Sequence, residues 1–403
     1  MALAARSTSS PSDGRHSSPS TPARTLTSVD GGTLGQAGAT DGPATPAPAT
    51  RSAYEVLHAA TAVGLPGGPT PVDVDDVDVE MLVGLATSEG LLGPLLAALP
   101  PDAQDLRERV LERHGSTMAW CLMLEQRLLD IDDWFAEAGG IRYLMLKGPS
   151  VAHLDEGDPS MRSFADLDLL IDAADIDRAL TVLQDHGAQR RIPEHHRGFD
   201  RRFAKGVGLT CGDGIEIDTH RTLCVGALGT RIPLGDLFAH PDHFEVGGRS
   251  FAALSLPHRA LHAAYHAVIG SSARQLRTLR DLAGYLGRLD PDTLTAEARR
   301  WRGETVLHTA VCQTFDALTF DAPAWRRWAA SFEPDPRDVA LIEASLHEST
   351  APFDVPFLRE LPWRDRPAYL WGVATPSKET LHSRGQTPWT RARDGVANLR
   401  RSR

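Results

Sequence analysis

Two aspartates separated by one residue are the clearest chemical feature of the sequence. Asp166 and Asp168 belong to the run Asp166–Ile171, whose other residues are apolar. In an extended strand both carboxylates point to one face, with Cα atoms roughly 6.5 Å apart at about 3.3 Å per residue. Two ionised carboxylates at that separation repel each other, and a divalent cation removes the repulsion. The spacing therefore predicts a metal site.

A third carboxylate follows at Asp218, where apolar and acidic residues alternate over Ile215–His220. If this second strand lies beside the first, Asp218 joins Asp166 and Asp168. A pair of metal ions held there could clamp the attacking and leaving oxygens of an in-line displacement at phosphorus. The alternative is an acidic strand edge that faces water, with ordinary solvated carboxylates.

Lysine is rare in this chain, so Lys147 stands out. The 42 basic residues include only three lysines, Lys147, Lys205 and Lys378. A compact ammonium suits a point contact to a phosphate or a carboxylate, where a forked guanidinium would not fit. The other interpretation is that lysine occurs here by chance.

The residues between these side chains predict a mixed α/β unit. Apolar runs bounded by glycine predict buried strands, and the Gly212-Asp213-Gly214 segment predicts a tight hairpin turn. The expected elements are strands over 141–146, 166–171, 203–211 and 214–219, with helices over 150–154 and 174–186.

Helical patterns lie on both sides of this unit. Residues 52–139 have apolar spacing typical of helices, and strand-like pieces around Gly247-Gly248 precede a helix that begins near Pro257. Further helices are expected over 276–289, 305–318 and 338–346. Residues 1–50 are rich in Ser, Thr, Pro and Gly and predict disorder, with a transit peptide as the alternative.

Composition narrows the classes of partner and compartment. The net charge of −11 argues against an extended nucleic-acid surface, which is usually basic. No apolar run approaches the ~20 residues that cross a bilayer. The four cysteines form no CxxC pair and predict reduced thiols in a cytoplasmic protein.

Several motifs together resemble a known family. They are Leu146-Lys147-Gly148, the Arg162-Ser163 pair before Asp166-Leu167-Asp168, and Glu216-Ile217-Asp218-Thr219-His220. They are similar to motifs of a poorly characterised bacterial nucleotidyltransferase family marked by Leu-Lys-Gly, within the DNA polymerase beta-like nucleotidyltransferase superfamily. The resemblance extends to Leu261-His262-x-x-x-His266, Leu279-Arg280-Asp281-Leu282 and Pro376-Ser377 with Leu381, and covers about residues 80–385.

The resemblance implies that Asp166, Asp168 and Asp218 bind metal and that neighbouring helices supply the acceptor site. It also implies Mg²⁺ or Mn²⁺ as cofactor and a nucleoside triphosphate (NTP) such as ATP as substrate. The superfamily usually carries Gly-Ser after its first strand, where amides and a hydroxyl hold the triphosphate. Here Pro149, which has no amide donor, separates Gly148 from Ser150.

Phosphate binding is therefore expected to be shared among several residues. The candidates are Lys147, Gly148, Ser150, Arg162 and Ser163. Arg162 and Ser163 suit charge-assisted contacts to the β- or γ-phosphate. The alternative for Arg162 is a loop cap or an ion pair with Asp158.

Histidines and one further aspartate are candidates for the acceptor site. His220 follows Asp218 by two residues and is expected on the same face. His258, His262 and His266 recur at metal-ligand spacing, but no glutamate accompanies them. We expect His262 and His266 to line the cleft or to pack in the core, with a zinc site as the alternative.

Asp281 has two interpretations. It is either an acceptor-site residue or the partner of Arg277 or Arg280 in an ion pair.

The expected fold is α+β, with a small mixed β-sheet nucleotidyltransferase core between an N-terminal helical segment and a C-terminal helical domain. The expected divisions are a disordered tail over 1–50, the helical segment over 51–140, the core over 141–256, the helical domain over 257–350 and an irregular Pro- and Trp-rich segment over 351–403.

The expected activity is transfer of a nucleoside monophosphate from an NTP to a hydroxyl or phosphate acceptor, with release of pyrophosphate. Asp166 and Asp168 would hold both metals, and Asp218 would bind the metal beside the acceptor and help deprotonate it. The acceptor is expected to be a small molecule, peptide or protein, with no nucleic-acid or membrane partner. A non-catalytic nucleotide-binding or regulatory module on the same fold is the alternative.

Overall fold

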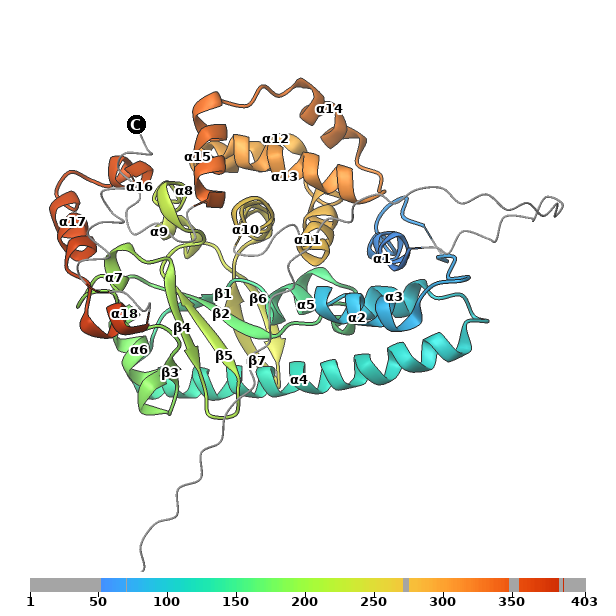
Figure 1. Ribbon diagram of the computed structural model, residues 1–403, viewed down its shortest axis with the longest axis horizontal. Coiled ribbons are helices and arrows are strands. Elements are labelled where there is room, and N and C mark those ends of the chain that lie inside the picture. Colours follow the sequence, from blue (N-terminus) through green and yellow to red (C-terminus); the bar gives the residue numbers. More distant parts are fainter. Residues whose placement is uncertain (1–51, 70, 271–274, 348–354, 384–386, 388–403) are drawn as a thin grey trace, which may run out of the picture. The chain divides into compact units, whose positions relative to one another are not determined.

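A seven-stranded mixed β-sheet organises the residues that the computed structural model describes, 52–69, 71–270, 275–347, 355–383 and 387 (Figure 1). The strand order is β3-β4-β5-β2-β1-β7-β6. The strands are β1 (Tyr143–Met145), β2 (Asp166–Ile171), β3 (Gln189–Arg190), β4 (Gly206–Thr210), β5 (Glu216–His220), β6 (Asp242–Val246) and β7 (Arg249–Ala253). The expected α+β fold is confirmed. The expected disorder over 1–50 lies outside the described residues.

Helices precede the sheet and connect its strands. The first are α1 (Ala53–Thr61), α2 (Val79–Glu89), α3 (Leu92–Ala98) and α4 (Gln104–Glu137). Between strands lie α5 (Pro149–Asp155), the 3₁₀ turn η1 (Pro159–Met161), α6 (Ile176–Asp185), α7 (Asp200–Phe203), α8 (Gly226–Gly229) and α9 (Leu234–Leu237). In the described part of the chain, no helix has both the length and the apolar character needed to cross a membrane.

Six helices lie between the last strand and residue 348 in the described part of the chain. They are α10 (Leu256–Ile269), α11 (Leu276–Leu286), α12 (Pro291–Arg300), α13 (Glu304–Ala317), α14 (Pro323–Ser331) and α15 (Pro336–His347). The sequence predicted four of them and missed α12 and α14. In α12 only Leu294 and Ala298 are buried, and in α14 only Trp325, so neither helix has a wide apolar stripe.

β2 forms where the sequence predicts it because its alternate residues are apolar and fully buried. Leu167 and Leu169 are 0 % exposed and belong to a core cluster with Leu124, Leu128 and Ile131 of α4. Figure 1 shows α4 running along this side of the sheet. The opposite face of β2 carries Asp166 and Asp168.

Parallel pairing of β2 with β5 brings the two acidic runs together. The register sets Asp166 opposite Glu216, Asp168 opposite Asp218 and Leu170 opposite His220. β4 is antiparallel to β5 and β1 is antiparallel to β2. Leu170, two residues beyond Asp168, packs in the core cluster that contains the inward faces of α10 and α11. Helices therefore cover the far end of the carboxylate face.

The described part of the C-terminal segment is helical. It contains α16 (Val355–Glu360), α17 (Arg366–Ala374) and α18 (Lys378–Ser383), so the expectation of an irregular segment was wrong for residues 355–383. Pro356 and Pro367 lie in the first turns of α16 and α17, where the missing amide donor costs nothing. The proposed division of the chain at 140, 256 and 350 remains a prediction.

Candidate active site

The carboxylates of Asp166, Asp168 and Asp218 lie on one face of the sheet, at the parallel β2–β5 junction. The side chain of Asp168 is 3 % exposed, whereas those of Asp166 and Asp218 are 30 % and 31 % exposed. One deeply buried carboxylate thus lies between two that solvent reaches.

Lys147 neutralises part of this charge. Its Nζ lies 2.8 Å from Asp168 Oδ2 and 3.4 Å from Asp166 Oδ2. Burial alone would lower the pKa of Lys147, but the two carboxylates outweigh burial and raise it, so the ammonium stays charged. Of the two contacts that the sequence suggested for Lys147, the carboxylate contact is the one present.

The two aspartates of β2 differ in their pKa. Burial favours protonation of Asp168, but the charge of Lys147 and the hydrogen bond with His220 outweigh it and hold the pKa well below its ordinary value. For Asp166, burial and the charge of Asp168 raise the pKa. The buried carboxylate is therefore the firmly ionised one.

His220 completes a group of possible metal ligands. Its Nε2 lies 2.8 Å from Asp168 Oδ1, and both side chains are buried. One ligand atom each from Asp168, Asp218 and His220 lie within 4.8 Å of one another. The partner of Asp168 Oδ2 is the Lys147 ammonium, a flexible cation that a metal ion can replace. Two carboxylates and an imidazole nitrogen are a donor set that fits Mg²⁺ or Mn²⁺.

Arg191 lies across the outer side of this group. It forms ion pairs with Asp218 and, at 2.6 Å, with Glu216. The guanidinium reaches β5 over Gly208, where an added Cβ would lie 2.4 Å from Arg191 Nη2. Glycine at position 208 thus leaves room for the arginine above the strand. The sequence provided no signal for this contact.

The turn after β1 is built around Gly148. Gly148 has φ 69°, a backbone conformation that other residues rarely adopt, and Pro149 begins α5. Ser150 is fully buried, and its hydroxyl donates to the Lys147 carbonyl at 3.4 Å. The hydroxyl therefore stabilises the turn that holds Lys147 against the aspartates.

Arg162 forms a buried ion pair with Asp281. Its Nε and Nη2 each donate to the carboxylate at 2.9 Å, and Nη1 donates to the Ser163 carbonyl at 2.5 Å. The side chains are 5 % and 8 % exposed. The partner is thus neither Asp158, as one interpretation of Arg162 had it, nor the Arg277 or Arg280 suggested for Asp281. Ser163 donates its hydroxyl to the Gly90 carbonyl at 3.2 Å.

The Arg162–Asp281 pair leaves Arg277 without a carboxylate partner among the described residues. Its Nη1 lies 2.6 Å from where a Cβ on Gly90 would be, close to Ser163. Burial and the charge of Arg162 lower the pKa of Arg277 to about 10, and Asp166 is near enough to counter that effect. A partly buried cation therefore faces the carboxylates with its donors open.

Lys205 is a second cation that the sequence analysis did not select. Its charge lowers the pKa of both His262 and His266. The rarity of lysine, which drew attention to Lys147, would have found it.

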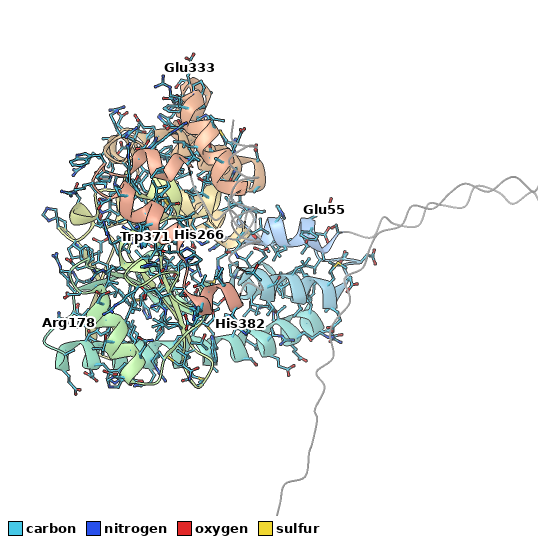
Figure 2. All side chains as sticks on the ribbon, turned by 60° about the vertical axis from the view of Figure 1, so that its left-hand side comes forward. Glu55, Arg178, His266, Glu333, Trp371 and His382 are labelled. Atoms are coloured by element: carbon cyan, nitrogen blue, oxygen red, sulfur yellow. The ribbon has the colours of Figure 1, made fainter. Side chains whose placement is uncertain are left out.

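The three histidines of α10 do not form a metal site. His258 pairs with Glu297 at 3.0 Å and stacks on Trp301, and the rings of His262 and His266 are 6.2 Å apart. The candidate ligand cluster found among the described residues is on β2 and β5. His266 lies in the interior between helices and sheet (Figure 2), and burial with the charge of Lys147 lowers its pKa to about 3. Burial and the charge of His266 also lower the pKa of His262.

The chain shows similarities to known proteins. The model of a family described as uncharacterised nucleotidyltransferase matches residues 75–317, more than half of the chain. A solved structure of an antigenic nucleotidyltransferase-like protein from Paracoccidioides brasiliensis is 13 % identical, with 52 % of this chain and 96 % of that chain covered and a TM-score of 0.26. No curated protein matches.

Proposed function

The chain belongs to the uncharacterised nucleotidyltransferase family, and we propose that it is an active, metal-dependent nucleotidyltransferase. It transfers a nucleoside monophosphate from an NTP to a hydroxyl or phosphate acceptor and releases pyrophosphate. The observation that supports this most strongly is the parallel pairing of Asp168 with Asp218, with Asp166 and His220 on the same face.

The carboxylates would hold Mg²⁺ or Mn²⁺. Asp166 and Asp168 would hold both ions, and Asp218 would hold the ion on the acceptor side. When bound, divalent ions neutralise charge on the phosphates and help position them. Since Lys147 and Arg191 are ion-paired with these carboxylates, both must shift when the ions bind.

The acceptor oxygen forms a bond to the α-phosphorus while the bond from that phosphorus to the β-phosphate bridging oxygen breaks. Asp218 takes the hydroxyl proton, which passes to solvent, and pyrophosphate leaves. Little covalent chemistry is asked of the protein, because positioning and charge neutralisation carry phosphoryl transfer.

Lys147, Arg277 and the backbone amides of Gly148 and Ser150 bind the phosphates in this proposal. Arg162 and Ser163 act differently from the sequence expectation. Since each of the three Arg162 nitrogens already donates a hydrogen bond, we assign Arg162 the role of fixing Asp281 and the loop before β2. Ser163 fixes the same loop against Gly90 and so sets the position of Arg277.

On the acceptor side we propose His220, His262, His266 and Asp281 as residues that shape the cleft. Of these four, His220 also offers a ligand atom to a metal held by Asp168 and Asp218. His262 and His266 are neutral imidazoles able to donate or accept one hydrogen bond each. The acidic composition favours a small molecule, peptide or protein over nucleic acid as acceptor. Four cysteines without a disulfide favour the cytoplasm.

The test is incubation of the protein with each radiolabelled NTP, Mg²⁺ or Mn²⁺ and cell extract, beside Asp168→Asn. Asp172→Asn, one residue beyond the end of β2, is the matched control. Label transfer should require Asp168 and tolerate Asp172→Asn. Transfer that persists in Asp168→Asn contradicts the proposal.

One observation favours the alternative of a non-catalytic binding module. All three carboxylates already have a cationic partner in Lys147 or Arg191. NTP-dependent thermal stabilisation without any label transfer by the wild type would support that alternative.

A further inference from the structure

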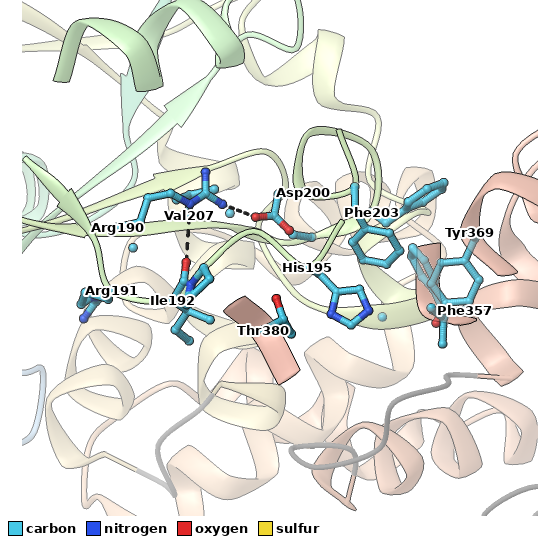
Figure 3. A pocket seen from close by; sticks show the side chains of 17 residues that line it. Arg190, Arg191, Ile192, His195, Asp200, Phe203, Val207, Phe357, Tyr369 and Thr380 are labelled. Carbon is cyan, nitrogen blue, oxygen red and sulfur yellow. Dashed lines mark hydrogen bonds and ion pairs between the residues drawn. The ribbon is translucent and has the colours of Figure 1, made fainter. Parts of the chain in front are cut away.

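A cavity lies beside β4 in the sheet, and Figure 3 shows it from close by. It encloses about 650 Å³, between the β3–β4 edge and the helices α16, α17 and α18. Arg191 belongs both to its wall and to the ion pair with Asp218. The cavity and the candidate active site are therefore neighbours that share the Arg191 side chain.

Strand β4 contributes two glycines to the lining of this cavity. Gly206 and Gly208 line it, and the antiparallel register sets them opposite His220 and Asp218. Cross-strand partners share one face of a sheet, so both glycines lie on the carboxylate face. The Arg191 guanidinium lies over Gly208 and pairs with Asp218, so a molecule in the cavity reaches the Asp218 carboxylate over β4 when Arg191 moves aside.

Aromatic rings form another wall of the cavity. Phe199 packs against His195 at 4.9 Å, Phe203 at 5.0 Å and Tyr369 at 5.9 Å between ring centroids. Figure 3 shows His195, Phe203, Tyr369 and Phe357 on one side of the cavity, and Arg190 and Arg191 on the other. Apolar rings facing guanidinium groups suit a flat apolar ligand that carries a negative charge.

The sheet order places this cavity where an attacking group is required. The strands run β4-β5-β2-β1, so the phosphate-binding turn after β1 and the cavity beside β4 lie on opposite sides of the carboxylates. In-line displacement sets the attacking and leaving oxygens on opposite sides of the phosphorus. If the pyrophosphate group lies on the β1 side, the acceptor must lie on the β4 side.

We propose that this cavity binds the acceptor, and that the acceptor is a small hydroxylated molecule with an aromatic ring. Its volume lies in the range of small-molecule sites, roughly 300–1,000 Å³. The ring packs against Phe199, the hydroxyl reaches over Gly208 to Asp218, and an acidic substituent lies near Arg191. This assignment of the acceptor rests on the proposed nucleotidyl transfer. The residues Phe357, Tyr369, Val373 and Thr380 come from beyond the part of the chain that the family model matches.

Two variants and one control test the cavity itself. Ile192→Trp adds bulk at a wall residue that is 66 % exposed, and Phe199→Ala removes the central ring. Leu346→Trp makes a similar change at an exposed position of α15, away from the cavity. Thermal melting establishes that each variant is folded.

Binding is measured first, without nucleotide, by saturation-transfer NMR with para-(hydroxymethyl)benzoate and with benzyl alcohol. We expect binding of the charged probe to the wild type and to Leu346→Trp, with a roughly tenfold loss in the two cavity variants. Binding that is equal in all four proteins, or no binding to the wild type, overturns the assignment. Neither result tests nucleotide binding, so the acceptor assignment can fail while the proposed nucleotidyl transfer stands.

Transfer is measured next, with α-labelled NTP, Mg²⁺ and the small-molecule fraction of a cell extract. We expect a labelled small product whose yield falls roughly tenfold in Ile192→Trp while NTP-dependent thermal stabilisation is unchanged. Undiminished transfer in Ile192→Trp, or label found on protein or RNA instead, overturns the proposal. If Asp168→Asn transfers as well as the wild type, the proposed function fails instead.

Discussion

Asp168 of β2 and Asp218 of β5 lie directly opposite each other in parallel register, and each is ion-paired with a different cation. Lys147 contacts the buried Asp168 from the β1 side, and Arg191 contacts the half-exposed Asp218 from the β3 side. The charges of these two carboxylates are thus balanced by two flexible side chains that a divalent ion can replace. The following predictions test what each of these groups does.

Arg191 should compete with metal for Asp218. In Arg191→Ala the Asp218 and Glu216 carboxylates lose their cation, so we expect Mn²⁺ to bind roughly three- to tenfold more tightly by calorimetric titration. Arg190→Ala is the matched control, since the neighbouring Arg190 pairs with Asp200 instead. Weaker Mn²⁺ binding in Arg191→Ala alone would mean that Arg191 supports the metal site.

Arg277 should bind phosphate without stabilising the fold. Because it has no carboxylate partner among the described residues and burial lowers its pKa, Arg277→Met should leave the free energy of unfolding unchanged or raise it by about 1 kcal/mol. The same variant should raise the KM for NTP roughly tenfold. Arg288→Met, two residues beyond the end of α11 and paired with Asp155, is the control. A normal KM with a large loss of stability would contradict the assignment.

The Arg162–Asp281 pair, in contrast to Arg277, should stabilise the fold. Removing either partner leaves a buried, uncompensated charge, so Arg162→Met and Asp281→Asn should each cost about 3–5 kcal/mol in urea unfolding. The double variant should cost clearly less than the sum of the two. Additive losses would show that the two side chains do not depend on each other.

Folding stability should fall as the pH drops, because of the buried histidines. Burial and the charge of Lys147 lower the pKa of His266 from 6.5 to about 3. Below about pH 6.5 the unfolded chain therefore takes up a proton that the folded chain does not, and the free energy of unfolding decreases toward about pH 3. Above that window both states are neutral and this contribution is constant.

The slope of stability against pH measures this contribution. Between about pH 7.5 and about pH 5, His266→Asn should lose roughly 2 kcal/mol less than the wild type, in urea unfolding at each pH. His258→Asn is the control, on the same helix but paired with Glu297. Parallel curves for wild type and His266→Asn would refute the neutral, buried state of His266.

The strands of the site could be predicted because apolar and acidic residues alternate along them, and this alternation indicates which face of each strand is buried. The alternation of Leu167 and Leu169 with Asp166 and Asp168 gave the bounds of β2 correctly, and the same texture around Asp218 indicated a neighbouring strand. Local turn chemistry was also readable, since Gly148 and Pro149 could be expected to end one element and begin the next.

The ion pairs could not be predicted, because a charged residue can pair with any opposite charge that the fold brings near it, and the sequence does not show which one that is. Arg162 and Asp281 are separated by 119 residues, and several arginines on α11 were equally available to Asp281. Arg191 reaches Asp218 for two reasons. The two-residue strand β3, which Arg191 follows, pairs with β4, and Gly208 of β4 has no side chain to block the guanidinium. Such contacts depend on tertiary register, and they decide which cations are left free to bind phosphate.

The position of the label in the transferred group tests the central claim most directly. The same NTP is supplied to the wild type with the label either at the α- or at the γ-phosphate, with Mg²⁺ and cell extract. We predict that the acceptor takes up the α-label and that the γ-label leaves as pyrophosphate, both abolished by Asp168→Asn. An acceptor that takes up the γ-label would make the protein a kinase and contradict the account.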